Sequence, residues 1–545
     1  MSFANIRVPY PINEKPKDYA PGSEERQLLQ KELERQLSTF VEIPLIIGGK
    51  AVYTGITKPV ICPHNHQHKL GVYHCGNEET VKQAVSCCQK VAREWQQTPW
   101  EERAAIFLKA AELLAGKYRY LLNAATMLGQ SKSVIQAEID AACELIDYFR
   151  FNVFFMNKIY NEQIYQKTET SWTRMEYRPL EGFIFAITPF NFTAISGNLP
   201  TAPAMMGNTV IWKPASTSVL SSYYIMQILR EAGLPDGVIN FIPGSGNDLG
   251  PIILDRPELA GIHFTGSTDT FKEMWKRIGF NVANNIYKTY PRIVGETGGK
   301  GFVLAYKDAD VEALSVALFR GAFEYQGQKC SAASRAYIPK SLWNDVRKLL
   351  AQMAEEAIVG DVSDFRTFMG AVIDKTSFSK IVGYIEEAKK SDEMKIEIGG
   401  FYDSTKGYFI HPTVIVTSNP KSKTMVEEIF GPVLTVYVYD DERFDEVMDL
   451  VDETSPYALT GSIFARDRAI IRKACQRLFQ AAGNLYINDK PTGAVVGQQP
   501  FGGARLSGTN DKAGSFLNLL RWTSPRTIKE NFAPPIDFTY PHMRT

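Results

Sequence analysis

One cysteine in the second half of the chain lies in a setting that suits chemistry better than packing. Cys330 belongs to the stretch FEYQGQKCSAASR, between a Gly-Gln-Lys tripeptide and a run of small residues. A thiolate is a strong nucleophile, and an exposed, electropositive setting favours its formation. Lys329 directly precedes the thiol and adds a positive charge. We therefore expect Cys330 to be a reactive thiol rather than an inert buried one.

The other six cysteines have more ordinary surroundings. Cys87, Cys88, Cys143 and Cys475 lie in predicted helices, where a buried cysteine packs as a small apolar residue, and Cys75 ends a predicted strand. An odd total of seven cysteines without a dense framework is typical of free thiols in a reducing compartment.

The sixth, Cys62, opens the stretch CPHNHQHKLGVYHC. This stretch holds four of the seven histidines, among them His64, His66 and His68. A structural zinc site would need a C-x-x-C pair or two histidines spaced along a helix, and the stretch offers neither. We predict a polar surface loop that runs into a strand and binds no metal, with metal binding as the alternative.

Glycines and a lysine that follow predicted strands indicate a nucleotide site. PGSGNDLG contains G-x-G-x-x-x-G, one residue longer than the dinucleotide fingerprint. In HFTGSTDTFKEMW a strand, then Gly266 and Ser267, lead into a helix, whose N-terminus favours an anion such as pyrophosphate. Lys213, in WKPAS, follows another strand and can reach a ribose or phosphate. A routine strand–helix turn is the alternative interpretation of the Gly266 motif.

Alternating strands and helices must position these residues. Residues 80–160 have a helical pattern, and short apolar runs such as GFIFAITPFNF then alternate with helical stretches. This alternation indicates a parallel sheet covered on both faces, with ligands at the carboxyl ends of its strands. After about residue 305 a second alternation begins, so we predict a second α/β domain with Cys330 near its start.

Composition excludes several classes of function. The 545 residues carry 60 Lys plus Arg and 60 Asp plus Glu, so no net charge attracts nucleic acid or an acidic membrane. No run approaches the roughly 18 apolar residues of a membrane span. The first residues lack an apolar signal region and mix acids with bases, which predicts a cytoplasmic location. The mitochondrial matrix is the alternative if a presequence was removed.

Several short motifs together resemble the aldehyde dehydrogenase family. PFNF, WKPAS, FTGS, GETGGK, GQKCSA, EEIFGPV and YINDKPTG occur in that family's order across roughly residues 40 to 525. GQKCSAASRAYIP, VIQAEIDAACELIDYFRFN and GQQPFGGARLSGTNDKAG look specifically like the branch that oxidises L-glutamate γ-semialdehyde, the Δ1-pyrroline-5-carboxylate dehydrogenases, in its stand-alone form. The resemblance implies an α/β fold with a Rossmann-like dinucleotide-binding domain, a second α/β catalytic domain and a small β arm for oligomerisation.

The chemistry of such an enzyme requires a thiol and a base. An aldehyde carbon has no hydride to release until a thiolate adds to it, and the thioester left after hydride loss must be hydrolysed by activated water. The resemblance makes Cys330 the nucleophile, with Gly327 leaving room for the cofactor, and Glu296 the base, beside a glycine pair that admits the nicotinamide. It makes Asn191, with the backbone N–H of Cys330, the holder of the developing oxyanion.

The resemblance also implies the cofactor and its contacts. NAD is expected, and the residues that match the family's dinucleotide site are Thr188, Lys213, Gly266, Ser267, Glu428 and Phe430. Glu428 and Phe430 would hold the nicotinamide ribose and ring. Ser216 occupies a place where many NAD-preferring relatives have Glu, so some NADP use is expected as well.

The substrate site is implied by the same branch. In DKPTGAVVGQQPFGG the backbone N–H groups of Gly493 and Ala494 would bind the substrate carboxylate, and such a nest of amides suits an anion. Ser331 would add a hydroxyl donor, and Phe501 would wall the methylene chain. Glu144 shares a helical stripe with Tyr148 and Phe151 and would receive the ammonium group, or it is an ordinary solvent-facing acid. Ile135, Ile139, Ala142, Ile146 and Phe149 form a second, apolar stripe on this helix.

Two other functions compete with this interpretation. A dehydrogenase for succinate semialdehyde or another short aldehyde would use the same chemistry, but the PTGAVVGQQPFGG loop looks adapted to the carboxylate of an amino acid. A non-catalytic scaffold with this fold would have lost at least one reactive group, whereas the thiol, carboxylate and amide are all present.

The predicted division of the chain follows from these patterns. We expect an N-terminal extension (1–40), an NAD-binding domain (41–305), a catalytic thiol domain (306–495), a return to the first domain with the substrate anchor (496–525), and a C-terminal arm (526–545). Residues 160–180 and the tail after Arg526 alternate aromatic and polar residues. They predict an edge ribbon that joins a homodimer or a higher homo-oligomer, with a plain surface hairpin as the alternative.

Overall fold

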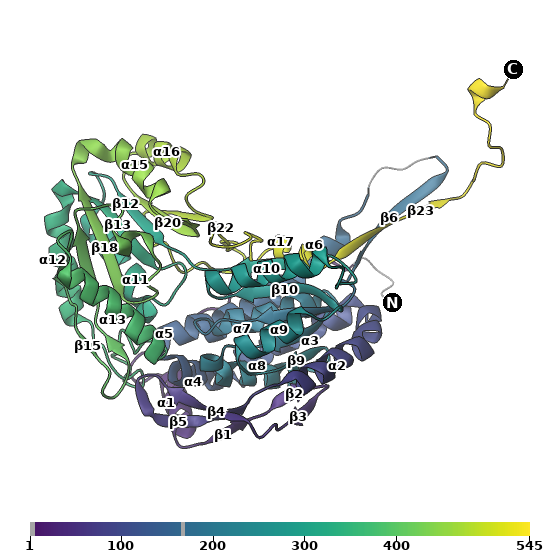
Figure 1. Ribbon diagram of the computed structural model, residues 1–545, viewed down its shortest axis with the longest axis horizontal. Helices are drawn as coiled ribbons and strands as arrows, with labels where there is room; N and C mark the ends of the chain where they lie inside the picture. Colours follow the sequence, from purple (N-terminus) through teal and green to yellow (C-terminus); the bar gives the residue numbers. More distant parts are fainter. Residues whose placement is uncertain (1–5, 165–168, 545) are drawn as a thin grey trace.

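The structure is a computed structural model that describes residues 6–164 and 169–544. Within these residues two seven-stranded sheets form two α/β bodies that lie side by side (Figure 1). The first sheet has the order β11-β10-β7-β8-β9-β2-β3. Its strands are β2 (Leu45–Ile47), β3 (Lys50–Val52), β7 (Phe183–Ile187), β8 (Thr209–Lys213), β9 (Ile239–Phe241), β10 (Leu259–Thr265) and β11 (Arg292–Glu296).

The central strands of this sheet, from β11 to β9, are parallel, as the apolar runs predict. In β7, Ile184 and Ala186 pack into one hydrophobic core, and Phe183 and Phe185 pack into the core on the opposite face. Because both of its faces are buried, β7 is apolar throughout. The main helices of the first body are α2 (Glu78–Gln97), α3 (Trp100–Ala115), α4 (Arg119–Gln130), α6 (Leu145–Asn161), α7 (Thr193–Met205), α8 (Val219–Ala232), α9 (Gly246–Leu254) and α10 (Thr268–Ala283).

The second sheet has the order β14-β17-β18-β13-β12-β20-β21, and β14 alone in it runs antiparallel to its neighbour. Its strands are β12 (Gly301–Ala305), β13 (Ala333–Pro339), β14 (Met394–Ile398), β17 (Thr413–Thr417), β18 (Val433–Tyr439), β20 (Thr460–Phe464) and β21 (Asn484–Ile487). Its main helices are α11 (Val311–Phe323), α12 (Lys340–Glu356), α13 (Lys375–Lys390), α15 (Phe444–Glu453) and α16 (Arg468–Arg477).

The predicted domain boundary at residue 305 is late by one strand. β12 pairs with β13 and β20 and therefore belongs to the second sheet. Between β11 and β12 lie only the residues TGGK, so the chain passes from one sheet to the other directly after Glu296. Pattern alone does not separate two apolar strands that follow each other so closely, because both are typical of parallel sheets.

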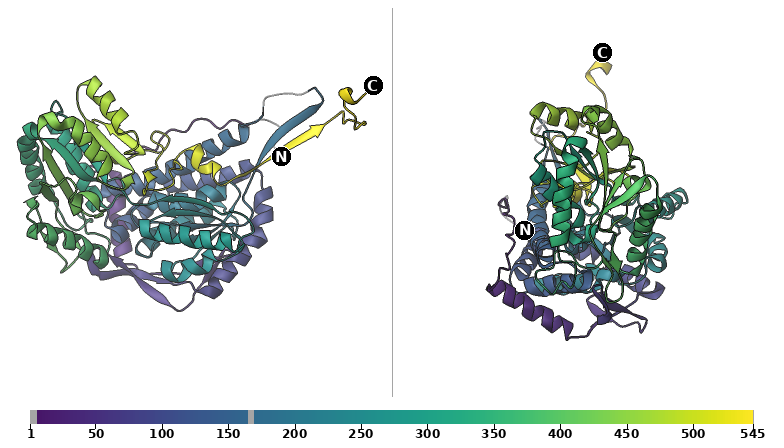
Figure 2. Two further views of the ribbon diagram at one scale, coloured as in Figure 1. Left: turned by 45° about the horizontal axis from the view of Figure 1, so that its top comes forward. Right: turned by 90° about the vertical axis from the view of Figure 1, so that its left-hand side faces the viewer.

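The segment 160–180 and the C-terminal tail form strands that pair with each other. β6 (Ser171–Arg178) and β23 (Ser524–Asn531) make an antiparallel ribbon that projects from the first body (Figures 1 and 2). The prediction of an extended ribbon at these two segments is confirmed, and both strands come from segments that are far apart in the sequence. The part of the prediction that concerns residues 165–168 lies outside the described residues.

The helical stretch before α6 differs from the predicted single stripe. A short helix, α5 (Val134–Ala137), is followed by a π-helix, η1 (Glu138–Glu144), and then by α6. The wider turn of a π-helix shifts the register of the side chains that follow it. Consequently Ile146 and Phe149 are buried as predicted, whereas Ile135 and Ile139 are each 43% exposed.

The histidine-rich stretch is a hairpin rather than a surface loop. β4 (Thr57–Cys62) turns directly into β5 (Asn65–His74), which also pairs with β1 (Val41–Ile43). Cys62 and His64 are almost fully buried, with the sulfur 3.0 Å from Nε2, because the turn packs against residues of the second body such as Gly407. The prediction of a polar surface loop is therefore wrong at these two residues. No group of three or more His, Cys, Asp or Glu placed to hold a metal occurs in residues 6–164 and 169–544.

Candidate active site

The segment before Cys330 has an unusual backbone. After α11, three consecutive residues in η3 (Glu324–Gly327) have left-handed conformations: Tyr325 (φ 51°), Gln326 (φ 57°) and Gly327 (φ 63°). A non-glycine residue persists in such a conformation only where its surroundings hold it there. Cys330, the predicted nucleophile, thus lies on a loop that the rest of the protein must fix.

Two glutamine side chains fix this loop. The amide of Gln326 donates to the carbonyl oxygens of Ser131 (2.9 Å) and Ala371 (2.6 Å) and accepts from the N–H of Gly370 (3.1 Å). Gln328 accepts a further bond from the N–H of Ile373 (2.9 Å). Because Ser131 follows α4 of the first body, these bonds tie the nucleophile's loop to both bodies.

The glycines around the site are required by close packing within the protein. A Cβ on Gly298 would lie 2.5 Å from a Glu428 oxygen, and one on Gly299 would lie 2.0 Å from the carbonyl oxygen of Cys330. A Cβ on Gly327 would lie 2.3 Å from the carbonyl oxygen of Gly431. The expectations that Gly327 leaves room for the cofactor and that the glycine pair admits the nicotinamide stay predictions.

A cavity of about 510 Å³ lies between the two bodies, with Cys330 in its wall. About half of its lining comes from the carboxyl ends of β7, β8 and β10 and from the loops that follow, as expected for a parallel sheet. It contains Asn191 and all six residues predicted for the dinucleotide: Thr188, Lys213, Gly266, Ser267, Glu428 and Phe430. Gly246 and Gly250, from the weaker glycine motif, also line it.

The chemistry of this cavity suits a dinucleotide. Burial lowers the pKa of Lys213 to about 8, and the ammonium group donates to the carbonyl of Pro214 (2.9 Å), with no carboxylate beside it among the described residues. Ser267 caps α10, whose free N–H groups attract an anion. The volume falls within the range typical of cofactor pockets, about 300–1,000 Å³.

A second, smaller cavity of about 30 Å³ adjoins the thiol. Glu296 and Phe501 line it together with Cys330, and so do Tyr148 and Asn198. A polar cavity of about 10–15 Å³ already holds one water molecule, so this one has room for the water that a hydrolytic step needs. The thiol is therefore reached from both cavities, and the carboxylate from the smaller one.

The electrostatic setting of Cys330 differs from the prediction. The residue is buried, with 8% of its surface exposed. Burial raises the pKa of the Cys330 thiol well above its usual range, and the carboxylates of Glu296 and Glu428 raise it further. Lys329 lies with its ammonium 3.4 Å from the carboxylate of Glu324, so its charge is paired there instead of supporting a thiolate.

Glu296 and Asn191 are both held by backbone groups. The Glu296 carboxylate accepts from the N–H of Gly503 (3.3 Å), and burial raises its pKa well above the ordinary value. The Asn191 amide donates to the carbonyl oxygen of Gln328 (3.0 Å), which places it beside the nucleophile's loop. A carboxylate with a raised pKa is a stronger base than an ordinary carboxylate, which suits hydrolysis of a thioester.

The residues predicted for the substrate lie around the same thiol, but only Phe501 lines either cavity. Ser331 shares a hydrogen bond (2.8 Å) with Thr492, which joins the nucleophile's segment to the loop that carries Gly493 and Ala494. The N–H groups of those two residues make no hydrogen bond within the described residues, so they are free to bind an anion.

Glu144 lies at the end of the π-helix and is half-buried. Burial and the neighbouring carboxylate of Asp140 raise the pKa of Glu144, while Lys132 and Lys329 oppose that rise. No hydrogen bond to its carboxylate is found within residues 6–164 and 169–544. The prediction of an ordinary solvent-facing acid is therefore wrong, although a contact with substrate stays a prediction.

Sequence reasoning missed part of each cavity. Ser377 and Lys380, on α13 of the second body, line the larger cavity, and Lys380 donates to the carbonyl oxygen of Glu428 (3.0 Å). His263 and Asn518 line the smaller one. His263 directly precedes the FTGS motif, whereas no motif surrounds the other three residues.

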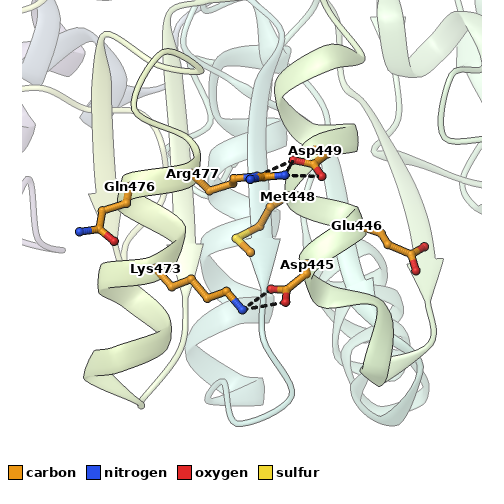
Figure 3. Close-up of a pocket in the computed structure, with 7 residues that line it drawn as sticks. All are labelled: Asp445, Glu446, Met448, Asp449, Lys473, Gln476 and Arg477. Atoms are coloured by element: carbon orange, nitrogen blue, oxygen red, sulfur yellow. Dashed lines mark hydrogen bonds and ion pairs between the residues drawn. The ribbon is translucent and has the colours of Figure 1, made fainter.

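A further hollow, between α15 and α16, is unsuited to catalysis. Its charged side chains are matched in pairs, Lys473 with Asp445 and Arg477 with Asp449 (2.5 Å each), as Figure 3 shows. Its other lining residues are Glu446, Met448 and Gln476, none of them a strong nucleophile. Within the described residues, no helix is long and apolar enough to cross a membrane.

Comparison with known proteins agrees with this geometry. The model of the aldehyde dehydrogenase family matches residues 54–528. A mitochondrial Δ1-pyrroline-5-carboxylate dehydrogenase of Dictyostelium discoideum is 52% identical, over 99% of this chain and 97% of its own length. One from Danio rerio is 47% identical, over 97% of this chain and 95% of its own.

Solved structures agree as well. The NAD-bound Δ1-pyrroline-5-carboxylate dehydrogenase of Mycobacterium tuberculosis is 51% identical and superposes with a TM-score of 0.96 over 100% of both chains. The Thermus thermophilus enzyme is 31% identical, with a TM-score of 0.90 over 97% of this chain and 100% of its own. From its motifs, its two sheets and these matches, the chain belongs to the aldehyde dehydrogenase family.

Proposed function

We propose that this protein oxidises L-glutamate γ-semialdehyde, the open form of Δ1-pyrroline-5-carboxylate, to L-glutamate with NAD, in proline breakdown. The observation that carries the proposal is the position of Cys330, which lies in the wall of both cavities. One of them contains the predicted dinucleotide residues and the other contains Glu296. Relatives of about half identity over nearly the whole chain are named for this substrate.

The Cys330 thiol first releases its proton to solvent, and the thiolate sulfur then adds to the aldehyde carbon. The oxygen of the thiohemiacetal then carries negative charge, which the Asn191 amide and the backbone N–H of Cys330 stabilise. Loss of one such donor typically costs about 2.7–4 kcal/mol of barrier. NAD held in the larger cavity would supply the hydride acceptor that turns the adduct on Cys330 into a thioester.

Glu296 completes the reaction. Its carboxylate takes a proton from a water in the smaller cavity, and the resulting hydroxide attacks the thioester carbon. The bond to sulfur breaks, L-glutamate leaves, and the proton passes from Glu296 to solvent. The bond from Gly503 N–H keeps the carboxylate at this cavity between turnovers.

We infer that the substrate carboxylate binds the free N–H groups of Gly493 and Ala494, with the Ser331 hydroxyl beside them. Phe501 walls the carbon chain, and Glu144 pairs with the ammonium group. The two ends of the substrate are thereby held while the aldehyde faces Cys330, which selects a semialdehyde of amino-acid type over a simple aldehyde.

For the cofactor, NAD is the main partner and NADP a weaker one. Glu428 is the one acid among the lining residues of the large cavity, and it comes from the opposite body to Lys213. Ser216, which donates to the carbonyl of Gly244 (3.4 Å), brings no negative charge near Lys213. A ribose 2′-phosphate therefore meets no carboxylate at that end.

We also infer a homo-oligomer that forms through the β6–β23 ribbon, at least a dimer, with neither nucleic acid nor membrane as partner. For the compartment, the names of the relatives from Dictyostelium discoideum and Danio rerio support the mitochondrial alternative over the cytoplasmic prediction.

The test follows NADH absorbance with Δ1-pyrroline-5-carboxylate as substrate, for the wild type and for Cys330→Ala. NADH production that disappears in the variant is the expected result. A folded, NAD-binding wild type that is inactive here but active on succinate semialdehyde would overturn the substrate, and activity that persists in Cys330→Ala would overturn the mechanism.

A further inference from the structure

The first described residues of the chain form an extended strap, residues 6–19, which reaches the substrate end of the site. The strap precedes residue 54, where the match to the aldehyde dehydrogenase family begins. It contacts the loop of residues 489–503, here called the anchor loop, which carries Gly493 and Ala494. A segment outside the family's shared core is thus built into the region that holds the substrate carboxylate.

The strap bonds to three consecutive residues of the anchor loop. The Asn13 amide nitrogen donates to the carbonyl oxygen of Val496 (2.8 Å), and its oxygen accepts from the side chain of Gln498 (2.9 Å). The Tyr10 hydroxyl donates to the carbonyl oxygen of Gly497 (3.1 Å). The strap therefore holds the loop's backbone within a few residues of the free N–H groups.

The strap is itself held rigidly on α6. Asn13 donates a second bond to Asp147 (2.7 Å), whose other oxygen accepts from the N–H of Glu14 (2.8 Å). The Glu14 carboxylate lies between Arg119 (2.7 Å) and Arg150 (2.8 Å). Asn13 therefore connects the anchor loop to α6, a long helix of the first body.

Aromatic packing adds to this support. The centroid of the Tyr10 ring lies 5.6 Å from the centroid of the Phe151 ring and 5.0 Å from that of the Phe154 ring, and both pairs are arranged edge to face. A Cβ on Gly497 would lie 2.1 Å from the Phe151 ring, so the loop lies directly on that side chain. The same helix thus supports both the strap and the loop.

The anchor loop needs such support because its own bonds are few. Between residues 493 and 499 they are the bonds from the N–H of Val495 to the Gln499 side chain (2.9 Å) and from the N–H groups of Gln498 and Gln499 to the Val495 carbonyl (3.0 Å each). Gly493 and Gly497 have left-handed φ of 92° and 81°, a conformation that glycine adopts without the steric penalty of a Cβ.

We propose that the strap, through Asn13 and Tyr10, positions the N–H groups of the anchor loop for the substrate carboxylate. Asn13 and Tyr10 are then positioning residues that set the preference for a carboxylate-bearing aldehyde. The reason is preorganisation: a loop already held in its binding geometry loses less entropy when the ligand binds. This inference rests on the proposed function and deepens it.

The test compares Tyr10→Phe and Asn13→Ala with the wild type on two aldehydes, L-glutamate γ-semialdehyde and propanal, in the full-length enzyme. Tyr10→Phe removes one hydroxyl and keeps the ring on Phe151. We expect the KM for the semialdehyde to rise about two- to tenfold for each lost bond, while kcat and both parameters for propanal stay unchanged.

Tyr19→Phe is the matched control. Tyr19 also belongs to the strap, but its hydroxyl donates to Glu138 (2.6 Å) and does not touch the anchor loop. This variant is expected to lower stability and to leave the KM for the semialdehyde unchanged. Calorimetry measures the equilibrium binding of L-glutamate independently of turnover. We expect weaker binding by Tyr10→Phe and Asn13→Ala and unchanged binding by Tyr19→Phe.

The outcomes separate the two proposals. If the wild type prefers the semialdehyde and both strap variants keep that preference and bind L-glutamate as the wild type does, the strap inference is wrong and the function stands. If both substrates lose activity equally, the strap is a general stabiliser and the inference is also wrong. If the wild type oxidises propanal but neither oxidises the semialdehyde nor binds L-glutamate, both proposals fail.

Discussion

The thiol of Cys330 and the carboxylate of Glu296 border one small cavity, and the charge of each group opposes ionisation of the other. Such groups titrate as a coupled pair. A base that lies this close to the nucleophile has two possible roles, to withdraw the thiol's proton or only to activate water. The sign of its effect on the thiol distinguishes them.

Glu296→Gln is expected to abolish turnover with Δ1-pyrroline-5-carboxylate and to lower the pKa of the Cys330 thiol, because a negative neighbour is removed. Alkylation of Cys330 by iodoacetamide, followed against pH, should therefore begin at a lower pH than in the wild type. Slower alkylation at every pH would instead show that Glu296 is the base for the thiol.

Glu144 offers a second test at this scale, because the pKa of its carboxyl is raised from the ordinary 4.5 on folding. The unfolded chain then loses that proton first, so the wild type loses stability as the pH rises above about 4.5. Glu144→Gln has no carboxyl that titrates at this position, so this variant does not lose stability there as the pH rises. Urea unfolding should find the variant more stable than the wild type at pH 7, with the difference vanishing toward pH 4.

The same variant tests binding of the ammonium group. Its KM should rise for L-glutamate γ-semialdehyde and stay unchanged for glutarate semialdehyde, which lacks the α-amino group. An equal change for both substrates would remove Glu144 from the substrate site.

Among the elements, the left-handed segment before Cys330 depends on its glycine. Gly327→Ala would place a Cβ 2.3 Å from the Gly431 carbonyl oxygen at a φ of 63°. We expect a loss of about 1–3 kcal/mol in the free energy of unfolding from the backbone alone, more from the clash, and a fall in kcat.

Gly383, inside α13, is the control for this substitution, since a Cβ at this position would have no other atom within 4 Å. Gly383→Ala is expected to raise the free energy of unfolding by about 0.5–1 kcal/mol, as alanine favours helix. Denaturant titration measures both variants, and equal effects would contradict the role of the left-handed backbone.

The elements that the sequence predicted best are those with a local signal. Gly266 and Lys213 follow apolar strands, and both strands end at the cavity as expected. Tyr325 and Gln326 carry no such signal, because neither residue type favours a left-handed backbone; bonds from Ser131 and residues 370–371 impose it. Burial of His64 likewise depends on residues of the second body.

For the whole molecule, the β6–β23 ribbon is the feature that a monomer does not explain. It consists of two strands without a third in the described residues, and Trp172 on it is 56% exposed. Two-stranded ribbons are marginal in water and expose strand edges that pair with other chains.

Deletion of residues 524–545 removes β23 and is expected to convert the proposed homo-oligomer to a monomer with an intact second sheet. Light scattering coupled to size-exclusion chromatography measures the mass, with the intact chain as its control. A shortened chain that keeps the mass of the intact oligomer would place the interface elsewhere.

The passage of the chain between its two sheets directly after Glu296 has a consequence for how such a protein can change. The carboxylate ends the last strand of one sheet, and the thiol precedes a strand of the other. A gene fragment that encodes either half therefore encodes no catalyst. Recombination that exchanges one part therefore keeps the pair of groups only where the incoming part supplies the group that the outgoing part carried.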